Sequence, residues 1–259
     1  MLSLFGTYAY AAESVHEEGG AGISIHLASE QLGTFLGLPI TNTLFTTWVS
    51  MAVLLVFAVV VGRNVRMVPG KLQSIFEALI EFSYKYIKET LGDEKQAKRY
   101  YPIIMTIFLF ILSINWIAQI PGLEGIMYNG HALFHAGTAD LNITLAFALI
   151  AFVTIEFAGI AALGIKKYGG KFINFHSPMG FALGLIELIS ELARLISFSF
   201  RLFGNIFAGK VLLLVVAFFV PFVLPVPLMA FELFVGFIQA FVFAILTLFF
   251  IKAATEMPH

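Results

Sequence analysis

The chain has 259 residues, of which 59% are hydrophobic and 12% are charged, and its formal net charge is −1. A soluble domain carries about 25% charged residues, so this composition excludes a soluble globular protein and indicates an integral membrane protein. The near-zero net charge excludes a global nucleic-acid-binding surface. The absence of cysteine excludes disulfides, thiolate metal sites and a cysteine nucleophile.

The N-terminal segment, residues 1–40, contains four glutamates and neither lysine nor arginine. Ala9-Tyr10-Ala11 resembles a signal-peptidase site, but the basic start and the longer apolar core of a signal peptide are missing. We therefore expect a flexible extracytoplasmic segment over residues 1–40, followed by a membrane domain over residues 41–259. Cleavage near residue 11 is the alternative.

The first apolar run that could cross the ~30 Å hydrocarbon core covers about residues 42–62. Arg63, Arg66 and Lys71 follow it directly, so the positive-inside rule places its end in the cytoplasm. Residues 70–100 carry apolar side chains at helical spacing with charged residues between them. This pattern predicts an amphipathic helix on the cytoplasmic side, which either lies in the interface or packs on other spans. Residues 92–99 would be the polar segment that follows it.

Two further spans are predicted at about residues 101–120 and 141–164. Pro121-Gly122 ends the first of them, and three lysines between residues 166 and 171 mark the cytoplasmic end of the second. Every basic cluster up to this point therefore falls on one side of the membrane.

The loop between these two spans contains two histidines and no lysine or arginine, as an external loop should. His131 and His135 are four residues apart, which would suit a metal pair on one face of a helix. Gly130 and Gly137 favour a loop instead, and two imidazoles do not complete a metal site. We expect no metal here.

The next segment is unusually long, because residues 178–220 contain no proline after the first position. A helix of about 42 residues would be about 63 Å long, twice the thickness of the membrane core. It must therefore be steeply tilted or lie partly along the cytoplasmic face. Prolines at 221, 225 and 227 predict an external turn, and a last helix from about Leu228 to Ala254 returns to the cytoplasm.

These segments predict an all-α integral membrane protein with five membrane-crossing helices and an amphipathic helix on the cytoplasmic side. The last two helices are long, and we expect them to form a hairpin. The N-terminus would lie outside and the C-terminus in the cytoplasm.

The polar residues of the long helix form a stripe, since each residue advances by 100° around the axis. Within about 40° of one direction lie Glu187, Glu191, Arg194, Arg201 and Asn205. An internal salt bridge between Arg194 and Glu187 or Glu191 would explain three of them without any function. Arg201 is different, because its nearest carboxylate in the sequence, Glu191, is ten residues away. It must find a partner on another segment or another chain.

Arg201 stands among Phe and Leu residues in an apolar run, and a charge at bilayer depth costs about 2.5–3.5 kcal/mol. It is therefore the leading candidate for a functional residue. On the last helix, Glu232 and Gln239 are seven residues apart and share a face. An antiparallel register in which paired residue numbers add to 440–442 would place Gln239 beside Arg201 and Glu232 beside Lys210.

The run Arg201-Leu-Phe-Gly-Asn205-Ile-Phe-Ala-Gly209 closely resembles the signature helix of subunit a of the F-type ATP synthase, the stator half of its proton channel. Asp140-Leu-Asn142-Ile-Thr144 resembles the start of the preceding helix of that family. Gln239-Ala-Phe-Val-Phe resembles its last helix, and Asn115-Trp116 and Pro121-Gly122 stand where its second span ends. The resemblance covers roughly residues 40–255.

The resemblance implies two long, strongly tilted helices that pack against the rotor ring. It also implies that Arg201 faces the carboxylates of the ring, that Asn205 and Gln239 lie beside it, and that Glu187 belongs to the cytoplasmic access path. The chain departs from the family at two positions. Lys210 stands where many bacterial members have glutamate, and Glu232 stands where some have histidine.

We therefore expect two offset aqueous half-channels that couple proton translocation to ATP synthesis. The external one would be lined by Asp140, Lys210, Glu232, Asn205 and Gln239. The cytoplasmic one would be lined by Glu187 and Glu191, with His176 as a further candidate, and Arg201 would stand between the two. No nucleotide-binding motif or metal constellation is evident, so the chain alone should catalyse no hydrolysis and needs no cofactor.

The resemblance also implies the partners of the chain: the proteolipid ring of c subunits, b-type peripheral stalk subunits, the remaining subunits of the ATP synthase and the lipid membrane, but no nucleic acid. The location would be a bacterial inner membrane or an equivalent energy-coupling membrane.

Two other classes of protein remain as alternatives. A secondary transporter could carry similar intramembrane charges, but it would usually show an internal repeat and broken helices, which this sequence lacks. A structural membrane scaffold would leave Arg201 unexplained. Co-purification with a proteolipid ring and nucleotide-hydrolysing subunits would discriminate among the three.

Overall fold

The computed structural model of the chain describes residues 29–35, 38–63, 70–120, 122–128, 130–172, 178–220 and 223–256. The helices are α2 (Asn42–Arg63), α3 (Lys71–Leu91), α4 (Glu94–Ala118), α5 (Leu141–Leu163), α6 (Ile165–Phe172), α7 (Pro178–Phe219) and α8 (Pro225–Thr255). The short strands are β1 (Gln31–Phe35), β2 (Leu38–Thr41), β3 (Met127–Tyr128) and β4 (His131–Ala132), and two single 3₁₀ turns cover Leu123–Gly125 (η1) and Gly137–Ala139 (η2). Five of the helices are long and apolar enough to cross a membrane, which confirms the predicted all-α membrane fold.

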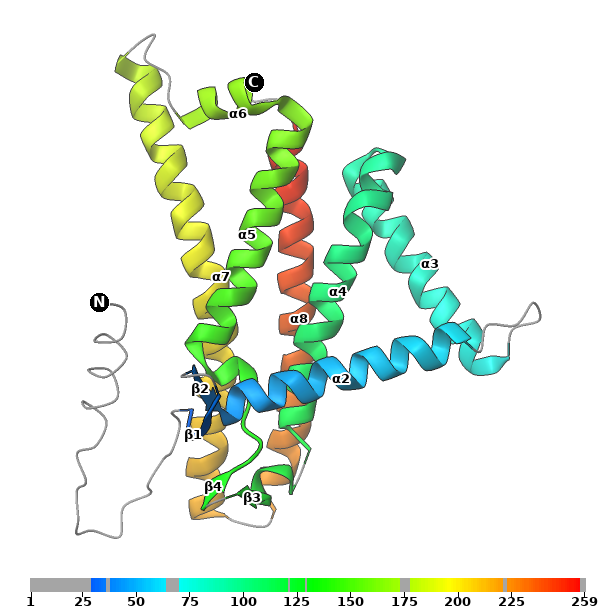
Figure 1. Cartoon of the computed structure of the whole chain (residues 1–259), viewed down its shortest axis with the longest axis vertical. Coiled ribbons are helices and arrows are strands. Elements are labelled where there is room, and N and C mark those ends of the chain that lie inside the picture. The colour runs from blue at the N-terminus through cyan, green and yellow to red at the C-terminus, as the bar shows by residue number, and fades with distance from the viewer. Residues whose placement is uncertain are drawn as a thin grey trace.

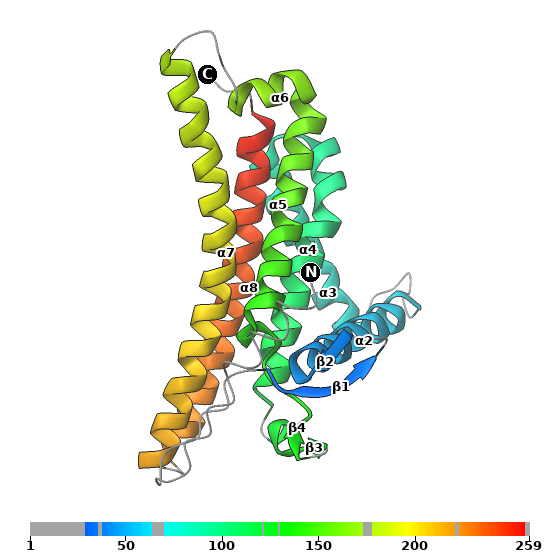
Figure 2. The same cartoon turned by 60° about the vertical axis from the view of Figure 1, so that its left-hand side comes forward.

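Four long helices, α4, α5, α7 and α8, run side by side along the long axis of the molecule (Figures 1 and 2). Their shared core is built from branched and small side chains, among them Ile111, Ile155, Leu202 and Ala240, which are almost completely buried. Small residues on α5 and α8 allow these helices to approach their neighbours closely. Close packing of this kind drives helix association in membranes. Moving an apolar side chain from lipid into a helix interface changes its hydrophobic free energy little, because lipid is itself apolar.

Helix α2 crosses the bundle near one end instead of running along it (Figure 1). It has 22 residues and a length of about 33 Å, which matches the ~30 Å hydrocarbon core. Helix α7 has 42 residues and a length of about 63 Å. In a membrane that α2 spans upright, α7 would therefore be inclined by about 60° if its ends reached the two surfaces. This geometry suits a steep tilt of the long helices.

The amphipathic helix is confirmed as α3, but the segment that follows it differs from the expectation. Helix α3 ends at Leu91 because Gly92 adopts a left-handed conformation with φ 73°. The side chain of Asp93 then accepts a hydrogen bond from the Lys95 backbone N–H at 3.1 Å and caps α4. The prediction that residues 92–99 form a polar segment between two helices is therefore wrong from Glu94 onward, because α4 begins at Glu94.

The last helix begins at Pro225, three residues earlier than expected, so Pro225 and Pro227 belong to its first turn instead of the connecting turn. Proline is tolerated there because the first backbone N–H groups of a helix have no intrahelical acceptor. The sequence also did not predict α6 or the two short hairpins. The β1–β2 hairpin pairs Gln31–Phe35 with Leu38–Thr41, and all of these residues except Thr41 belong to the segment that we expected to be flexible.

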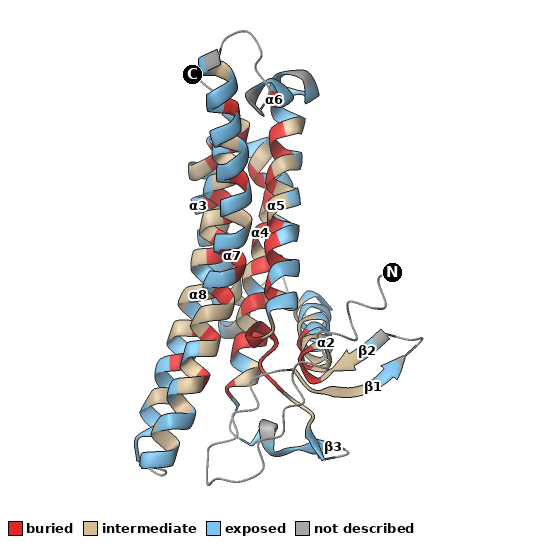
Figure 3. Cartoon of the chain, turned by 90° about the vertical axis from the view of Figure 1, so that its left-hand side faces the viewer, coloured by how far each residue is buried: buried red, intermediate tan, exposed pale blue. Residues whose placement is uncertain are grey.

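Burial is uneven among the long helices. In the apolar window of α7 only 17% of the residues are buried, compared with 39% in α5 and in α8. Figure 3 shows buried residues concentrated on the inner faces of α4 and α5, whereas most of α7 is exposed or half-buried. Helix α7 therefore presents a long apolar surface to its surroundings.

The short helix α6 folds back against the bundle through Tyr168, which is only 3% exposed. The Tyr168 hydroxyl donates a hydrogen bond to Oε2 of Glu156 on α5 at 3.0 Å. Burial of the ring, and secondarily the nearby Glu156 carboxyl, raise the pKa of the Tyr168 hydroxyl above its ordinary value, so it remains a hydrogen-bond donor at all physiological pH values. The ring lies directly on Gly159, where an added Cβ would stand 2.2 Å from Tyr168 Cε2.

We expect Gly159→Ala to destabilise the chain by about 1–3 kcal/mol, because the new methyl group must displace the Tyr168 ring and with it the hydrogen bond to Glu156. Thermal unfolding of the purified full chain in detergent measures this effect. Gly169→Ala on α6 is the matched control, since no atom lies within 4 Å of its added Cβ and alanine is the better helix former. Equal melting of Gly159→Ala and the wild type would show that the close contact is absent.

Candidate functional site

Arg201 lies near the middle of α7 with an exposed side chain. It borders a cavity of about 310 Å³ between α7 and α8, whose other lining residues are Ser190, Ala193, Arg194, Ser197, Phe198, Leu246 and Phe250. The guanidinium makes one long hydrogen bond, from Nη2 to Ser197 Oγ at 3.5 Å, and no ion pair with any residue that the structure describes. The expected carboxylate partner of Arg201 is therefore absent from the described part of this chain, which leaves another chain as its source.

Arg194, two turns before Arg201, is held by Glu191 of its own helix and by Phe250 of α8. Its Nη1 atom lies 2.6 Å from Glu191 Oε2, and its guanidinium carbon lies 4.0 Å from the centre of the Phe250 ring. The predicted internal salt bridge is thus confirmed for Arg194 and Glu191. Because Glu191 is 3% exposed and already bonded to Arg194, any role for it in an aqueous path requires this pair to be hydrated or to open.

The antiparallel register of α7 and α8 follows from two contacts. The ring of Phe198 packs on Phe243 with centroids 4.7 Å apart. A Cβ built on Gly209 would meet Glu232 Oε1 at 2.6 Å, so the Glu232 carboxyl lies directly on the backbone of α7. The residue numbers of both pairs add to 441, within the predicted range of 440–442. Gln239 is accordingly level with Leu202, the neighbour of Arg201.

Glu232 is buried, with 9% of its surface exposed, and so is Lys210, with 8%. The Glu232 carboxyl accepts a hydrogen bond from Gln119 Nε2 at the end of α4 and lies on Gly209, the residue before Lys210. The sequence did not single out Gln119. No local pattern marks it, because its partner Glu232 is 113 residues away in the sequence.

Helix α4 holds this part of α8 through two further hydrogen bonds, and a third joins α4 to the 3₁₀ turn η2. Asn115 Nδ2 donates to the Gly236 carbonyl at 3.2 Å, and Trp116 Nε1 donates to the Leu233 carbonyl at 3.2 Å. Asn115 Oδ1 in turn accepts from Thr138 Oγ1 at 2.7 Å. Gly236 permits the close approach, since an added Cβ would stand 3.1 Å from Asn115 Cβ. Hydrogen bonds from α4 therefore hold in place the turn of α8 that carries Glu232.

Asn205 and Gln239 are both half-buried. Asn205 is one turn after Arg201 on α7, and its Nδ2 atom is buried without a hydrogen-bond partner in the described part of the chain. A buried amide donor of this kind is costly unless a water or a partner group bonds to it. The position next to Arg201 thus offers a free donor toward which a water or a polar group of another chain could orient.

Asp140 has a structural role at the start of α5. It caps α5, with Oδ1 accepting from the Asn142 backbone N–H at 2.9 Å, and Oδ2 accepts from Thr43 Oγ1 of α2 at 2.9 Å. The structure therefore places Asp140 at the junction of α2 and α5. Its predicted place in a half-channel is a separate property that these bonds do not test.

At the other end of α7, Glu187 is half-buried and lies one turn before Glu191. His176 lies outside the described residues. The two histidines of the loop between α4 and α5 do not share a helical face. His131 belongs to β4 and lies 3.3 Å from the Glu30 carboxylate, whereas buried His135 follows in the loop. No group of three potential metal ligands occurs within the described ranges.

The candidate site thus has three parts along α7. A carboxylate-rich part holds Glu187 and Glu191, a second part holds Lys210 and Glu232, and Arg201 lies between them with its side chain exposed. On the inner face of α7, Phe198 and Leu202 are 2% and 1% exposed and fill the space behind Arg201 with apolar side chains. Such an arrangement separates two polar regions and places a permanent positive charge between them.

Comparisons with known proteins show relatives of this chain. The family model of the ATP synthase A chain matches residues 44–252. The chain is 37% identical over 207 residues to ATP synthase subunit a of Campylobacter jejuni, covering 79% of this chain and 85% of that protein. It is 35% identical over 214 residues to the Moorella thermoacetica subunit a, covering 83% and 90%, and 36% identical over 243 residues to the Mycobacterium bovis subunit a, covering 91% and 95%.

Proposed function

Since the chain belongs to the family of ATP synthase subunit a, the membrane proton-channel stator of the F-type ATP synthase, we propose that Arg201 is the fixed charge between two half-channels that serve a rotating ring. The observation that carries this proposal is the exposure of Arg201 on the outward surface of α7 without a carboxylate partner among the described residues. A carboxylate of a ring subunit that passes α7 would supply the missing partner.

The mechanism follows from elementary electrostatics. A guanidinium close to a carboxyl group favours the ionised form and lowers the pKa of that group. Each ring carboxyl that approaches Arg201 therefore releases its proton before it passes and takes up a proton on the other side. Arginine does not lose its own proton in a protein, so it blocks a direct proton leak between the two regions.

The two regions are the half-channels. On the external side the path is lined by Asp140, Lys210, Glu232, Asn205 and Gln239, of which Lys210 and Glu232 form a charge-compensated pair. On the cytoplasmic side the path is lined by Glu187 and Glu191. The register of α7 and α8 supports this division, because it brings Glu232 next to Lys210 and keeps both away from Glu191.

The partners of the chain are the other subunits of the ATP synthase, and the finer contacts are proposals. The proteolipid ring of c subunits packs on the exposed apolar surface of α7. The b-type peripheral stalk holds the chain from the other side. The N-terminus lies outside and the C-terminus in the cytoplasm, which is supported by the basic residues that follow α2 and α5.

Co-purification tests the proposed assembly. A tag on the C-terminus of the full chain should recover the proteolipid ring and the nucleotide-hydrolysing subunits in mild detergent. Vesicles that contain the recovered complex should synthesise ATP when a proton gradient is imposed. Recovery of the chain alone, with a transport activity of its own, would favour a secondary transporter and contradict the proposal.

A further inference from the structure

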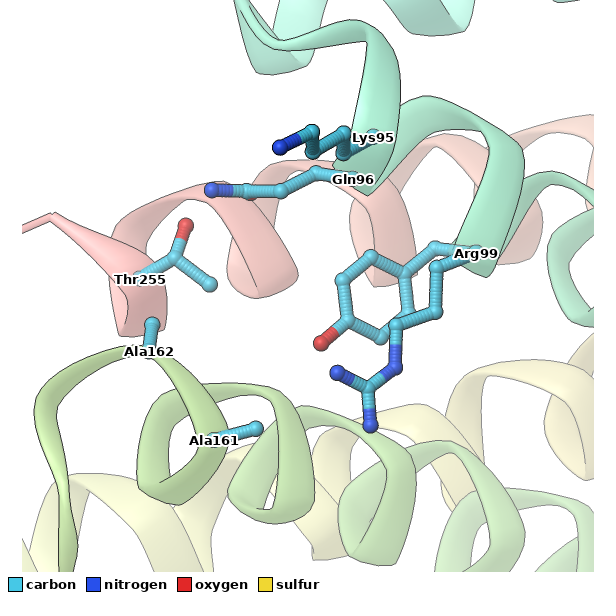
Figure 4. Close-up of a pocket in the computed structure, with 7 residues that line it drawn as sticks. Lys95, Gln96, Arg99, Ala161, Ala162 and Thr255 are labelled. Atoms are coloured by element: carbon cyan, nitrogen blue, oxygen red, sulfur yellow. The ribbon is translucent and has the colours of Figure 1, made fainter.

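A second cavity lies at the opposite end of the bundle from Glu232, between the start of α4 and the ends of α5 and α8 (Figure 4). Its volume is about 180 Å³, and its lining residues are Lys95, Gln96, Arg99, Tyr100, Ala161, Ala162 and Thr255. None of these residues belongs to the site around Arg201, and the proposed half-channels do not use them.

The cavity carries two cations that lack a counter-charge. Lys95 and Arg99 make no ion pair within the described part of the chain. The neighbouring carboxylate is already occupied, since Glu94 lies 2.8 Å from both Lys88 Nζ and Lys98 Nζ. Figure 4 shows Lys95, Gln96 and Arg99 extending from α4 into the gap toward Thr255 and Ala161. An anion would therefore find two uncompensated charges there.

Polar atoms of the same wall also lack partners. Tyr100 is 8% exposed and stands beneath Arg99, whose guanidinium carbon is 5.8 Å from the centre of its ring. The Tyr100 hydroxyl makes no hydrogen bond to any residue that the structure describes. Gln96 Oε1 is buried and also has no hydrogen-bond partner in the described ranges. A ligand with acceptor oxygens would pair with the two cations and with the Tyr100 hydroxyl.

The position of the cavity favours a lipid over a small soluble ion. It lies where α5 and α8 end, next to the point where the charged start of α4 gives way to its apolar run. Below Ala161 on the same face of α5, the exposed side chains of Phe157, Val153 and Ile150 continue an apolar surface along the helix. An acyl chain could follow this surface while the headgroup stays in the cavity.

We propose that this cavity binds the headgroup of an anionic phospholipid. The phosphodiester lies between Lys95 Nζ and the Arg99 guanidinium and accepts the hydrogen bond of the Tyr100 hydroxyl. Basic pockets between membrane helices on the cytoplasmic side recognise anionic headgroups through this chemistry of charge-assisted hydrogen bonds. The lipid would tie α4 to the ends of α5 and α8.

Native mass spectrometry of the purified full chain, taken from vesicles of phosphatidylcholine with phosphatidylglycerol, tests this proposal. We expect one retained phosphatidylglycerol per wild-type chain and an apparent affinity at least about tenfold lower in the double variant Lys95→Gln, Arg99→Gln, corresponding to about 1.4 kcal/mol. The matched control Lys85→Gln, Lys98→Gln removes two exposed charges outside the cavity and should keep the bound lipid.

A second variant and a second ligand complete the test. Ala162→Leu fills the cavity without changing any charge and should also reduce retention. Circular dichroism of each variant confirms that the chain is folded. Equal retention in the wild type and in both cavity variants would overturn the proposal. Inorganic phosphate that is retained from phosphatidylcholine vesicles, or that displaces the lipid, would show a site for free phosphate and would equally contradict it.

Discussion

Replacing Arg201 with alanine should abolish proton-coupled ATP synthesis while leaving the chain inserted in the membrane. The structure gives Arg201 no ion pair within its described residues, so the loss of its charge breaks no internal contact of the folded chain except the long hydrogen bond to Ser197. Without the fixed charge, nothing lowers the pKa of a passing ring carboxyl, and nothing prevents protons from leaking between the two half-channels. ATP synthesis in vesicles should fall to the level of an uncoupled control.

Arg201→Lys should fail as well, although it keeps a cation. A lysine can lose its proton when it is desolvated, and its ammonium cannot form the two parallel hydrogen bonds that a guanidinium makes with a carboxylate. Arg63→Ala and Arg63→Lys, at the exposed end of α2, are the matched controls and should leave synthesis unchanged. Near-normal coupled synthesis in either Arg201 variant would contradict the role of this residue.

The second large effect concerns Lys210 and Glu232. Neutralising one of them leaves the other as an uncompensated buried charge, which costs about 3–5 kcal/mol in a fully buried pair and less where water enters. Lys210→Gln and Glu232→Gln should therefore each impair assembly or coupling. Glu232→Gln should impair assembly or coupling less than Lys210→Gln does, because the oxygen of the new amide can still accept the hydrogen bond from Gln119 on the α4 side.

Exchanging the two charges distinguishes a pair from two independent residues. The double variant Lys210→Glu, Glu232→Lys should recover part of the coupled synthesis that each single variant loses. Cysteines at both positions should form a disulfide readily, and the chain has no native cysteine that would interfere. If neither rescue nor cross-linking occurs, Lys210 and Glu232 are not neighbours and the inferred pair is wrong.

The spans and their register could be predicted because they depend on local composition and on a few charges. Apolar runs bounded by Arg63 or by Pro121-Gly122 define helix lengths without reference to the fold. The register of α7 and α8 was predicted from the nearly equal residue-number sums of two polar pairs, Arg201 with Gln239 and Lys210 with Glu232. The contact of Glu232 with Gly209 agrees with it. A buried charge restricts the register of a helical hairpin more strongly than an interface of phenylalanine and leucine does.

The features that the sequence did not predict depend on contacts between distant segments. Gln119 reaches Glu232 across 113 residues, and Tyr168 reaches Glu156 only because Gly159 leaves room for its ring. The β1–β2 hairpin and α6 are too short for hydrophobic periodicity to reveal them. The start of α4 was placed too late because its first turns are charged, although Asp93 is an ordinary N-cap residue.

The role of each polar residue in proton transfer cannot be read from its position alone. Asp140 caps α5 and binds Thr43, and Glu191 binds Arg194, so both have structural reasons to be where they are. Arg201 and Asn205 have no such reason within the described residues, since one lacks a counter-charge and the other a hydrogen-bond partner. The interactions of Arg201 and Asn205 therefore depend on the chain or lipid that packs against α7.

The sidedness of water access along α7 tests the central claim most directly. Arg201 is about 21 Å from Glu187 and about 14 Å from Lys210 along the helix axis, so the two half-channels need not meet. In the assembled complex, the single substitutions Glu187→Cys and Glu191→Cys should react with a small charged thiol reagent from the cytoplasmic side only. Asn205→Cys, Lys210→Cys and Glu232→Cys should react from the external side only, and Arg201→Cys should be protected by the ring. A continuous series of positions that react from both sides would describe an open pore, which cannot hold a proton gradient, and would contradict two half-channels separated by Arg201.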